Sequence, residues 1–269
     1  VQNGDNPRFL HNFWEHHWGI WEPIQISFDK TIDFAGAHAV LRPGLTSGHY
    51  SEVSWHDQSP GARGRMGVLI RHMNRLPATF YLGLTFDQNV CAIVPYREID
   101  LGPVWCFCSS EDFQKHVRSI DQNLKVTNAT LVKIPFNLVH WQKIAAKKYP
   151  NGLPEPESND PTQWLFHGWP AEAQESTQLQ VAIARLLGYR WPAELDDKMR
   201  LSKRARALVA KCGELARFAD NDGIVCIPAV RGEDPAAERL LRLLNACGIK
   251  PNCDLDDWLR NGFFEEHCK

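Results

Sequence analysis

The sequence predicts an α+β protein with a mixed α/β first half and a mainly helical second half. Short β-rich runs bounded by Gly and Pro lie before residue 136, and amphipathic helical patterns dominate after residue 175. Between them, residues 149–156 are rich in Pro, which removes backbone donors and restricts its neighbours. We therefore expect two domains, residues 1–148 and residues 149–269.

The first half is expected to combine short strands with one clear helix. Gly and Pro punctuate residues 43–64, which predicts a loop or an irregular hairpin. A helix is predicted over residues 111–120, capped by Ser109 or Ser110, with Phe113, Val117 and Ile120 facing inward. Strands are predicted at residues 79–82, 90–94 and 130–134.

The second half is expected to be helical after a long irregular segment. Residues 149–175 predict a wrapping loop, because Trp164, Phe166 and Trp169 would be costly to leave in water. Capping residues and Gly stops then delimit the helices. We expect them to start at Ser176, Ser202, Asp234-Pro235 and Asp254, with Leu240, Leu241, Leu244 and Cys247 on the core face of the third.

Composition sets the broad class. No stretch approaches the roughly 20 apolar residues of a membrane helix, and no secretory leader is visible, so a soluble protein of the bacterial cytoplasm is expected. The eight cysteines form no CxxC pair and are expected to be reduced and buried. Since the chain starts at Val1 and stops abruptly, we expect a piece of a longer protein.

Familiar catalytic motifs are absent from the sequence. It contains no Gly-rich phosphate or dinucleotide loop, no GxSxG elbow and no HExxH pair. An adenine methyltransferase needs a cofactor loop and an Asn/Asp-Pro-Pro-aromatic motif, and this chain has no Pro-Pro dipeptide. We expect no catalytic residue, no metal site and no cofactor within this chain.

A histidine cluster is the most enzyme-like feature. His11, His16 and His17 could ligate a metal together with Glu15, which would suit a metal-dependent hydrolase. Adjacent histidines rarely bind one ion, and the interleaved aromatic residues favour packing instead.

Local basic stretches are more informative than the overall charge of −2. Residues 58–86 contain four arginines and no carboxylate, and residues 113–148 contain seven cations and only one acid, Asp121. Lys and Arg neutralise DNA phosphates, and Arg and Asn can read base edges. A solvated charged face is the competing interpretation.

Several collinear segments then resemble the target-recognition region and C-terminal extension of large adenine-specific DNA methyltransferases. These enzymes are the single-chain type II restriction–modification enzymes and phage-defence methyltransferases of the PglX and DISARM kinds. The resemblance covers roughly residues 65–269, and residues 1–64 match poorly. The matching segments are RLPATFY (75–81), FDQN (86–89), AIVP (92–95), VWCFCSS (104–110), VRSIDQ (117–122), LKVTNATLVKIPF (124–136), DPTQWLFHG (160–168), LQVAIARLLGYRWP (179–192), DGIVCIP (222–228) and WLRNGFF (258–264).

The resemblance implies a fragment that binds double-stranded DNA while an upstream methyltransferase domain flips and methylates the adenine. S-adenosylmethionine is then implied for the parent enzyme only, and a nuclease is an open possibility for that parent. Base readout is expected from loops in residues 43–75. The DNA-binding candidates are Arg63, Arg65, Arg71, Asn74, Arg75, Lys115, Arg118 and Lys125. Asn128 is expected to fix a turn.

The main rival is a protein-interaction scaffold. Residues 151–269 carry a net charge of −4, and this acidic helical half could recruit a partner subunit without any DNA contact. A steep salt dependence of DNA binding would favour the DNA-binding hypothesis over the scaffold, and stoichiometric metal would favour the hydrolase.

Overall fold

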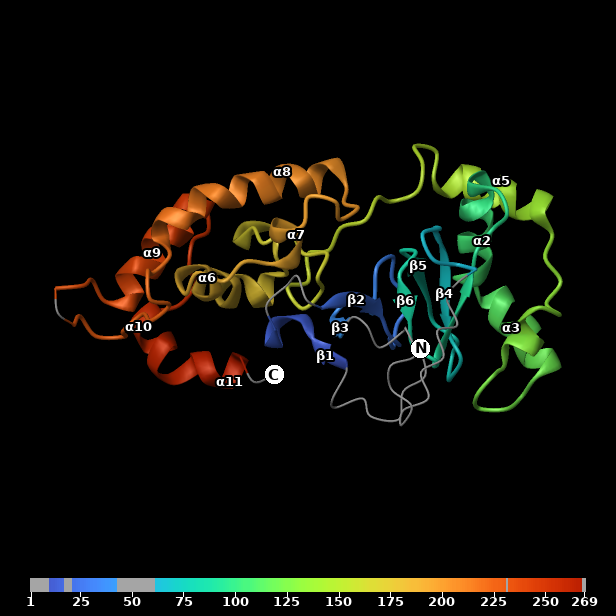
Figure 1. The fold of residues 1–269 in the computed structure, drawn as a ribbon, viewed down its shortest axis with the longest axis horizontal. Helices are drawn as coiled ribbons and strands as arrows, with labels where there is room; N and C mark the ends of the chain where they lie inside the picture. Colours follow the sequence, from blue (N-terminus) through green and yellow to red (C-terminus); the bar gives the residue numbers. More distant parts are fainter. Residues whose placement is uncertain (1–9, 17–20, 43–60, 231, 268–269) are drawn as a thin grey trace. The chain divides into compact units, whose positions relative to one another are not determined.

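The computed structural model describes residues 10–16, 21–42, 61–230 and 232–267 (Figure 1). Helices and strands both occur, which confirms the α+β class. The chain forms two compact units, residues 1–155 and residues 156–269, and the division lies within the Pro-rich segment. Throughout the described residues, each helix is too short or too polar to cross a lipid bilayer.

The described part of the first unit contains two small sheets followed by helices (Figure 1). Its strands are β1 (Leu10–Asn12), β2 (Glu22–Gln25), β3 (Ala39–Leu41), β4 (Gly67–Arg71), β5 (Ala78–Tyr81), β6 (Thr85–Phe86) and β7 (Val90–Ile93). Its helices are η1 (Phe13–Glu15), η3 (Glu98–Asp100), α2 (Leu101–Cys108), α3 (Glu111–Ile120), α4 (Asn128–Leu131) and α5 (Leu138–Lys148).

The strands pair within two sheets. The four-stranded sheet has the order β1-β3-β2-β6, in which only the β2–β6 pair is parallel. The three-stranded sheet has the order β5-β4-β7 and is antiparallel. The strands predicted at 79–82 and 90–94 are confirmed as β5 and β7.

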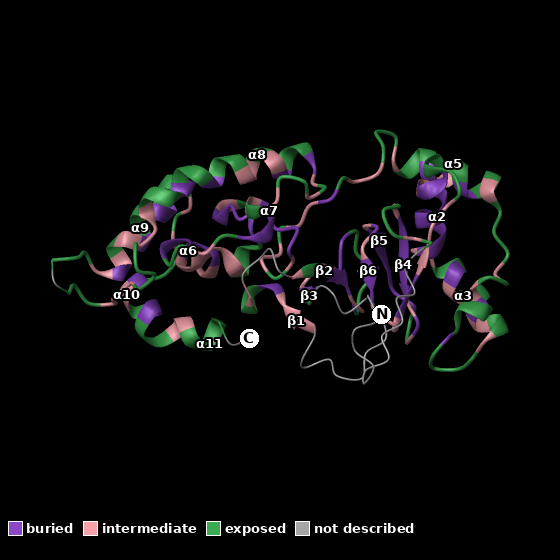
Figure 2. Ribbon diagram, in the orientation of Figure 1, coloured by how far each residue is buried: buried purple, intermediate pink, exposed green. Residues whose placement is uncertain are grey.

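Side chains alternate between the two faces of the three-stranded sheet, and both faces are buried. Phe80 lies on one face and stacks on Trp105 of α2, with ring centroids 4.3 Å apart. Leu69 and Tyr81 lie on the other face, in a core that includes Phe86. Figure 2 shows buried residues gathered on these strands and on α2. The sheet is therefore a rigid support for the segments at its ends.

Gln25 joins the two sheets from inside the core. Its side chain is fully buried, and its amide nitrogen donates to the carbonyls of Phe80 (2.9 Å) and Ala35 (3.1 Å). Its amide oxygen accepts from the Leu82 N–H at 2.9 Å. A buried amide is tolerated only when such partners satisfy it, so Gln25 fixes how β2 lies against β5.

Two local predictions in the first unit were wrong. Residues 130–134 form no strand, because the Thr127 carbonyl accepts from the N–H groups of Thr130 and Leu131 and starts the short helix α4. Ile120 is 48% exposed and does not face inward. The helix over 111–120 is confirmed, and its cap is Ser110, whose hydroxyl accepts from the Phe113 N–H at 3.2 Å.

The second unit is helical in its described part. Its elements are η4 (Pro170–Glu172), η5 (Glu175–Thr177), α6 (Gln178–Leu186), α7 (Pro192–Leu195), α8 (Lys203–Cys212), η6 (Gly213–Phe218), α9 (Ala236–Cys247), α10 (Leu255–Asp257), the π-helical turn η7 (Trp258–Gly262) and α11 (Phe263–His267).

Most of the helix caps and stops predicted for the second unit are confirmed. Ser202 caps α8 by accepting from the Ala205 N–H, and Asp254 caps α10. Gly248 ends α9 in the left-handed conformation, with φ of 75°. The start of α6 was predicted wrongly, because Ser176 lies inside the preceding 3-10 turn η5.

One core residue of α9 was assigned wrongly. Leu241 is 41% exposed, and Leu243 is buried instead, together with Leu240 and Leu244. The irregular segment before α6 buries its aromatic residues as expected, since Trp164, Phe166 and Trp169 are each at most 3% exposed.

Replacing Gln25 with Met tests the connection between the sheets. Gln25→Met keeps the shape but removes the side-chain partner of two buried backbone groups and one partly buried group, so the free energy of unfolding should fall by about 3 kcal/mol. Urea denaturation of the intact chain measures this, and hydrogen exchange should accelerate in β2 and β5 peptides. Gln122→Met, at an exposed position, is the control and should cost less than about 0.5 kcal/mol. Equal losses in the two variants would contradict the role of Gln25.

Candidate nucleic-acid interface

The turn between β4 and β5 presents two of the candidate residues. Asn74 and Arg75 are both exposed there. Asn74 and Leu76 have φ of 58° and 53°, in the left-handed region that side chains other than Gly seldom adopt. Asn tolerates this conformation, whereas Leu76 is held in it by burial, being only 1% exposed. The shape of the turn therefore depends on its tertiary contacts.

A second segment, residues 118–128, fixes this turn from the side. The guanidinium of Arg118 donates to the Asn74 carbonyl at 2.6 Å, and the Val126 N–H donates to the His72 carbonyl at 2.8 Å. The imidazole Nε2 of His72 lies 3.0 Å from the Asn128 side-chain oxygen. Burial lowers the pKa of His72, so this histidine is neutral at pH 7 and serves to join the two segments.

These contacts bring four of the candidate residues together in what we call the turn patch: Asn74, Arg75, Arg118 and Lys125. Lys125 lies in an isolated β-bridge with Met73, directly beside the turn. Asn74, Arg75 and Lys125 are exposed. The turn patch thus joins segments that lie about 50 residues apart in sequence.

The turn patch is positively charged. Within the described residues, Arg118 donates to the backbone carbonyls of Asn74, Asn123 and Asp121 and has no carboxylate bonded to it. The nearby acid Asp121 accepts hydrogen bonds from Asn123 and Thr130, which lower its pKa. The turn patch therefore carries three cations, with the Asp121 carboxylate nearby.

Lys115 is brought near the turn patch but is partly neutralised. It lies three residues before Arg118 on α3, and residues at this spacing share one side of a helix. Its ammonium is 3.6 Å from Glu111 and 3.9 Å from Asp112. We expect Lys115 to contribute less to an anion-binding surface than Arg75 or Lys125.

The remaining arginine candidates lie elsewhere in the first unit. Arg63 and Arg65 come before β4, and the turn patch lies beyond its other end, roughly 15 Å away for a strand of this length. Arg65 donates to the Pro95 carbonyl and Arg63 to the Thr85 hydroxyl, each at 2.5 Å. Arg71 forms an ion pair with Asp29 and donates to the Phe28 carbonyl, so it braces the fold.

An exposed apolar pair beside Arg65 was missed in the sequence. Tyr96 is fully exposed and Ile99 is 81% exposed, and both follow the Pro95 carbonyl that Arg65 contacts. The bidentate ion pair of Arg97 with Asp100 (2.7 and 3.0 Å) stabilises this loop. The sequence signal that could have revealed this pair is Tyr96 and Arg97, which directly follow the Pro after β7.

Base readout was expected from loops in residues 43–75, of which residues 43–60 lie outside the described residues, as does His17. The rest of the histidine cluster is packed. His11 Nδ1 and His16 Nε2 are 2.6 Å apart, and the His16 ring stacks on Trp21 at 4.0 Å. Among the described residues, no three His, Cys, Asp or Glu side chains are placed to hold a metal ion.

Five buried cysteines have a raised pKa, so none of these five is an activated nucleophile. Burial raises the pKa of Cys212 to about 12 and that of Cys247 to about 11, and it also raises the pKa of Cys91, Cys106 and Cys108. A thiol reacts as the thiolate, so these side chains serve as small apolar residues.

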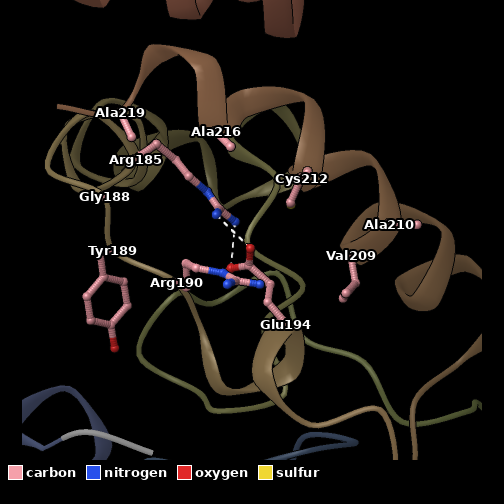
Figure 3. A pocket seen from close by; sticks show the side chains of 11 residues that line it. Arg185, Gly188, Tyr189, Arg190, Glu194, Val209, Ala210, Cys212, Ala216 and Ala219 are labelled. Atoms are coloured by element: carbon pink, nitrogen blue, oxygen red, sulfur yellow. Dashed lines mark hydrogen bonds and ion pairs between the residues drawn. The ribbon is translucent and has the colours of Figure 1, made fainter. Parts of the chain in front are cut away.

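The second unit has a cavity of about 360 Å³ next to a buried ion pair (Figure 3). Arg185 and Glu194 point toward one another there, and each side chain is only 5% exposed. Two hydrogen bonds of 2.7 and 2.8 Å join them, and Arg185 also donates twice to the Gly168 carbonyl. Glu194 in turn accepts from the Trp191 N–H at 2.7 Å. The pair therefore joins α6, α7 and the segment before η4.

Close packing around this pair explains the glycine at 168. Gly168 has φ of 85°, and a Cβ there would lie 2.0 Å from the Arg185 guanidinium. Because every polar group of the pair has a partner, the wall of the cavity is structural.

Comparisons with protein-family models and with curated proteins find no match for this chain. The interpretation of the site therefore rests on its geometry and on the sequence resemblance.

Breaking the buried ion pair should destabilise the second unit strongly. Arg185→Met leaves the Glu194 carboxylate buried without its charge partner, so the free energy of unfolding should fall by about 3–5 kcal/mol. Arg190→Met changes an exposed arginine that lines the same cavity, and it should cost less than about 0.5 kcal/mol. Thermal and urea denaturation measure both variants. A loss below about 1 kcal/mol in Arg185→Met would show that the pair is dispensable.

His167 should make the second unit sensitive to acid. Burial, followed by the charges of Arg204 and Arg185, lowers its pKa from 6.5 to about 4, and its Nδ1 accepts from the Trp169 N–H. The unfolded state takes up a proton below pH 6.5 and the folded state does not until about pH 4. Stability from this group is thus complete above pH 6.5 and is lost as the pH falls toward 4, by roughly 3 kcal/mol.

The matched variant is His167→Asn, whose side-chain oxygen can replace Nδ1 as acceptor. Urea denaturation at pH 7, 5.5 and 4 should show a smaller acid loss for the variant than for the native chain. Identical pH profiles would exclude His167 as the source.

Proposed function

We propose that the first unit is a DNA target-recognition domain of an adenine-specific DNA methyltransferase in a bacterial restriction–modification or phage-defence system. It would hold double-stranded DNA in the cytoplasm while a catalytic domain elsewhere in the same protein flips and methylates an adenine. S-adenosylmethionine would bind to that catalytic domain. The observation that carries the proposal is the turn patch, a cationic surface assembled from two segments.

The groups in the turn patch suit the two kinds of contact that DNA recognition requires. Lys125 and Arg118 offer charge for phosphates, which set the register of a protein on the duplex. Asn74 and Arg75 lie at the tip of a narrow turn, where an amide and a guanidinium can reach base edges in the major groove. Because Arg118 and Val126 hold the turn from the side, little order would have to be gained on binding.

Arg63 and Arg65 would form a second contact along the same duplex. A separation of roughly 15 Å along β4 spans several phosphates, since B-DNA carries about one charge per 1.7 Å of helix axis. The exposed ring of Tyr96 beside Arg65 adds an apolar contact of the kind found near sugars and bases.

Salt-dependent DNA binding tests the proposal. The intact chain should bind a mixed-sequence duplex, with log Kd rising linearly with log salt in fluorescence anisotropy. Arg75→Gln combined with Lys125→Gln removes two cations of the turn patch. We expect the magnitude of the salt slope to fall by about 2 and the affinity at 100 mM salt to fall about 10- to 100-fold.

The control for this experiment is Lys198→Gln with Lys250→Gln, two exposed cations of the second unit. This double variant has the same net charge and should bind DNA like the native chain. Equal losses for the two double variants would contradict a specific interface. The absence of DNA binding at 50 mM salt would favour the protein-interaction scaffold.

A further inference from the structure

A groove in the first unit lies apart from the turn patch. It has a volume of about 370 Å³, and its walls come from α2, α3, α5 and the segment before α5. Figure 1 shows these helices side by side at one end of the first unit. Phe107, Phe136 and Trp141 supply its aromatic surface, and Asp112, His116, Asn137 and His140 are its polar groups.

The aromatic residues form a platform rather than a cage. Phe107 and Trp141 are 6% and 7% exposed, whereas Phe136 is 39% exposed. The Phe136 ring packs on Phe107 with centroids 5.3 Å apart, and Phe107 packs on Trp141 at the same separation. Phe136 is therefore an open ring face on a rigid aromatic base, which suits a flat ligand.

The polar groups leave both donors and acceptors for that ligand. His116 Nδ1 donates to the Asp112 carbonyl at 2.7 Å, so Nε2 is the ring nitrogen left for a ligand. The side-chain oxygen of Asn137 accepts from the His140 N–H at 3.1 Å, which leaves its NH₂ group to donate. The Asp112 carboxylate adds a further acceptor, shared with Lys115 at 3.9 Å.

Two exposed lysines are close in sequence to residues of the groove wall. Lys143 follows His140 by three residues on α5, so the two share one side of the helix. Lys133 is exposed three residues before Phe136. A ligand that combines a flat heterocycle, hydrogen-bonding edges and a phosphate matches this combination of groups.

We propose that this groove binds a nucleobase, stacked on Phe136 and contacted at its edge by Asp112, His116 and Asn137. The base comes either from an unpaired, extrahelical nucleotide of bound DNA or from a free mononucleotide. The DNA source rests on the proposed function of the first unit, and the mononucleotide source does not.

Two probes test the groove. The first is AMP, observed by saturation-transfer NMR and calorimetry. The second is a duplex with one bulged adenine, compared by anisotropy with the same duplex fully paired. We expect the bulged duplex to bind about 5- to 100-fold more tightly, as stacking of one base allows, and AMP to give saturation transfer to its adenine protons.

Substitutions at Phe136 identify the platform. Phe136→Leu keeps an apolar contact with Phe107 but removes the ring face, and should abolish both the preference for the bulge and the AMP signal. Phe136→Trp should retain them. Phe264→Leu, at a 68% exposed phenylalanine of the second unit, is the matched control and should behave like the native chain.

The possible outcomes separate the two proposals. Phe136-dependent AMP binding supports the groove even if the chain does not bind duplex DNA. A Phe136-dependent preference for the bulge without an AMP signal assigns the base to DNA. The inference is overturned if neither signal depends on Phe136, or if N-acetylphenylalaninamide binds the groove and AMP does not.

Discussion

The first unit depends on one buried amide. Gln25 lies where the edge of one sheet meets the other, and it satisfies two carbonyls and one N–H that would otherwise be unpaired in the core. Thr79 adds to this connection, because its hydroxyl donates to the Asp33 carbonyl and accepts from the Ala35 N–H. Polar bonds fix direction as well as distance, so the three-stranded sheet has a defined position against β2.

The fixed sheet supports the narrow, strained turn between β4 and β5. Left-handed backbone at Asn74 and Leu76 costs free energy, which the burial of Leu76 and the bonds from Arg118 and Val126 offset. Contacts between distant segments thus hold the turn patch at one end of β4. Arg63 and Arg65 form a separate group of cations before its other end. The groove proposed to bind a nucleobase uses a different part of the unit, the packing of α3 and α5 on α2.

Local sequence signals predicted the capped helices and the strands β5 and β7, whereas β1 to β4, β6, α2 and α5 were not predicted. Ser110, Ser202 and Asp254 cap helices through bonds spanning two or three residues, so the sequence indicates them, although it left the first cap open between Ser109 and Ser110. The strand expected at 130–134 failed because an alternating β-branched pattern cannot reveal whether a neighbouring strand exists. The amphipathic pattern also left single positions ambiguous, as the exposed Leu241 illustrates.

The residues of the candidate site could likewise be predicted only in part. Arg75 and Lys125 could be chosen from basic composition, but the pairing of Arg71 with Asp29 joins residues 42 positions apart. Nothing in a single sequence distinguishes an arginine that has such a partner from one that does not. Phe136 and its groove were equally hidden, because their aromatic neighbours come from separate helices.

Arg118 combines two duties that proteins usually assign to different side chains. Its planar fork holds the carbonyls of Asn74 and Asn123 while its charge remains part of the exposed surface. A lysine would preserve the charge but could not hold both carbonyls in the same geometry. A neutral donor could hold the carbonyls but would lose the charge. A substitution at this position would therefore change the shape of the turn and the charge beside it together.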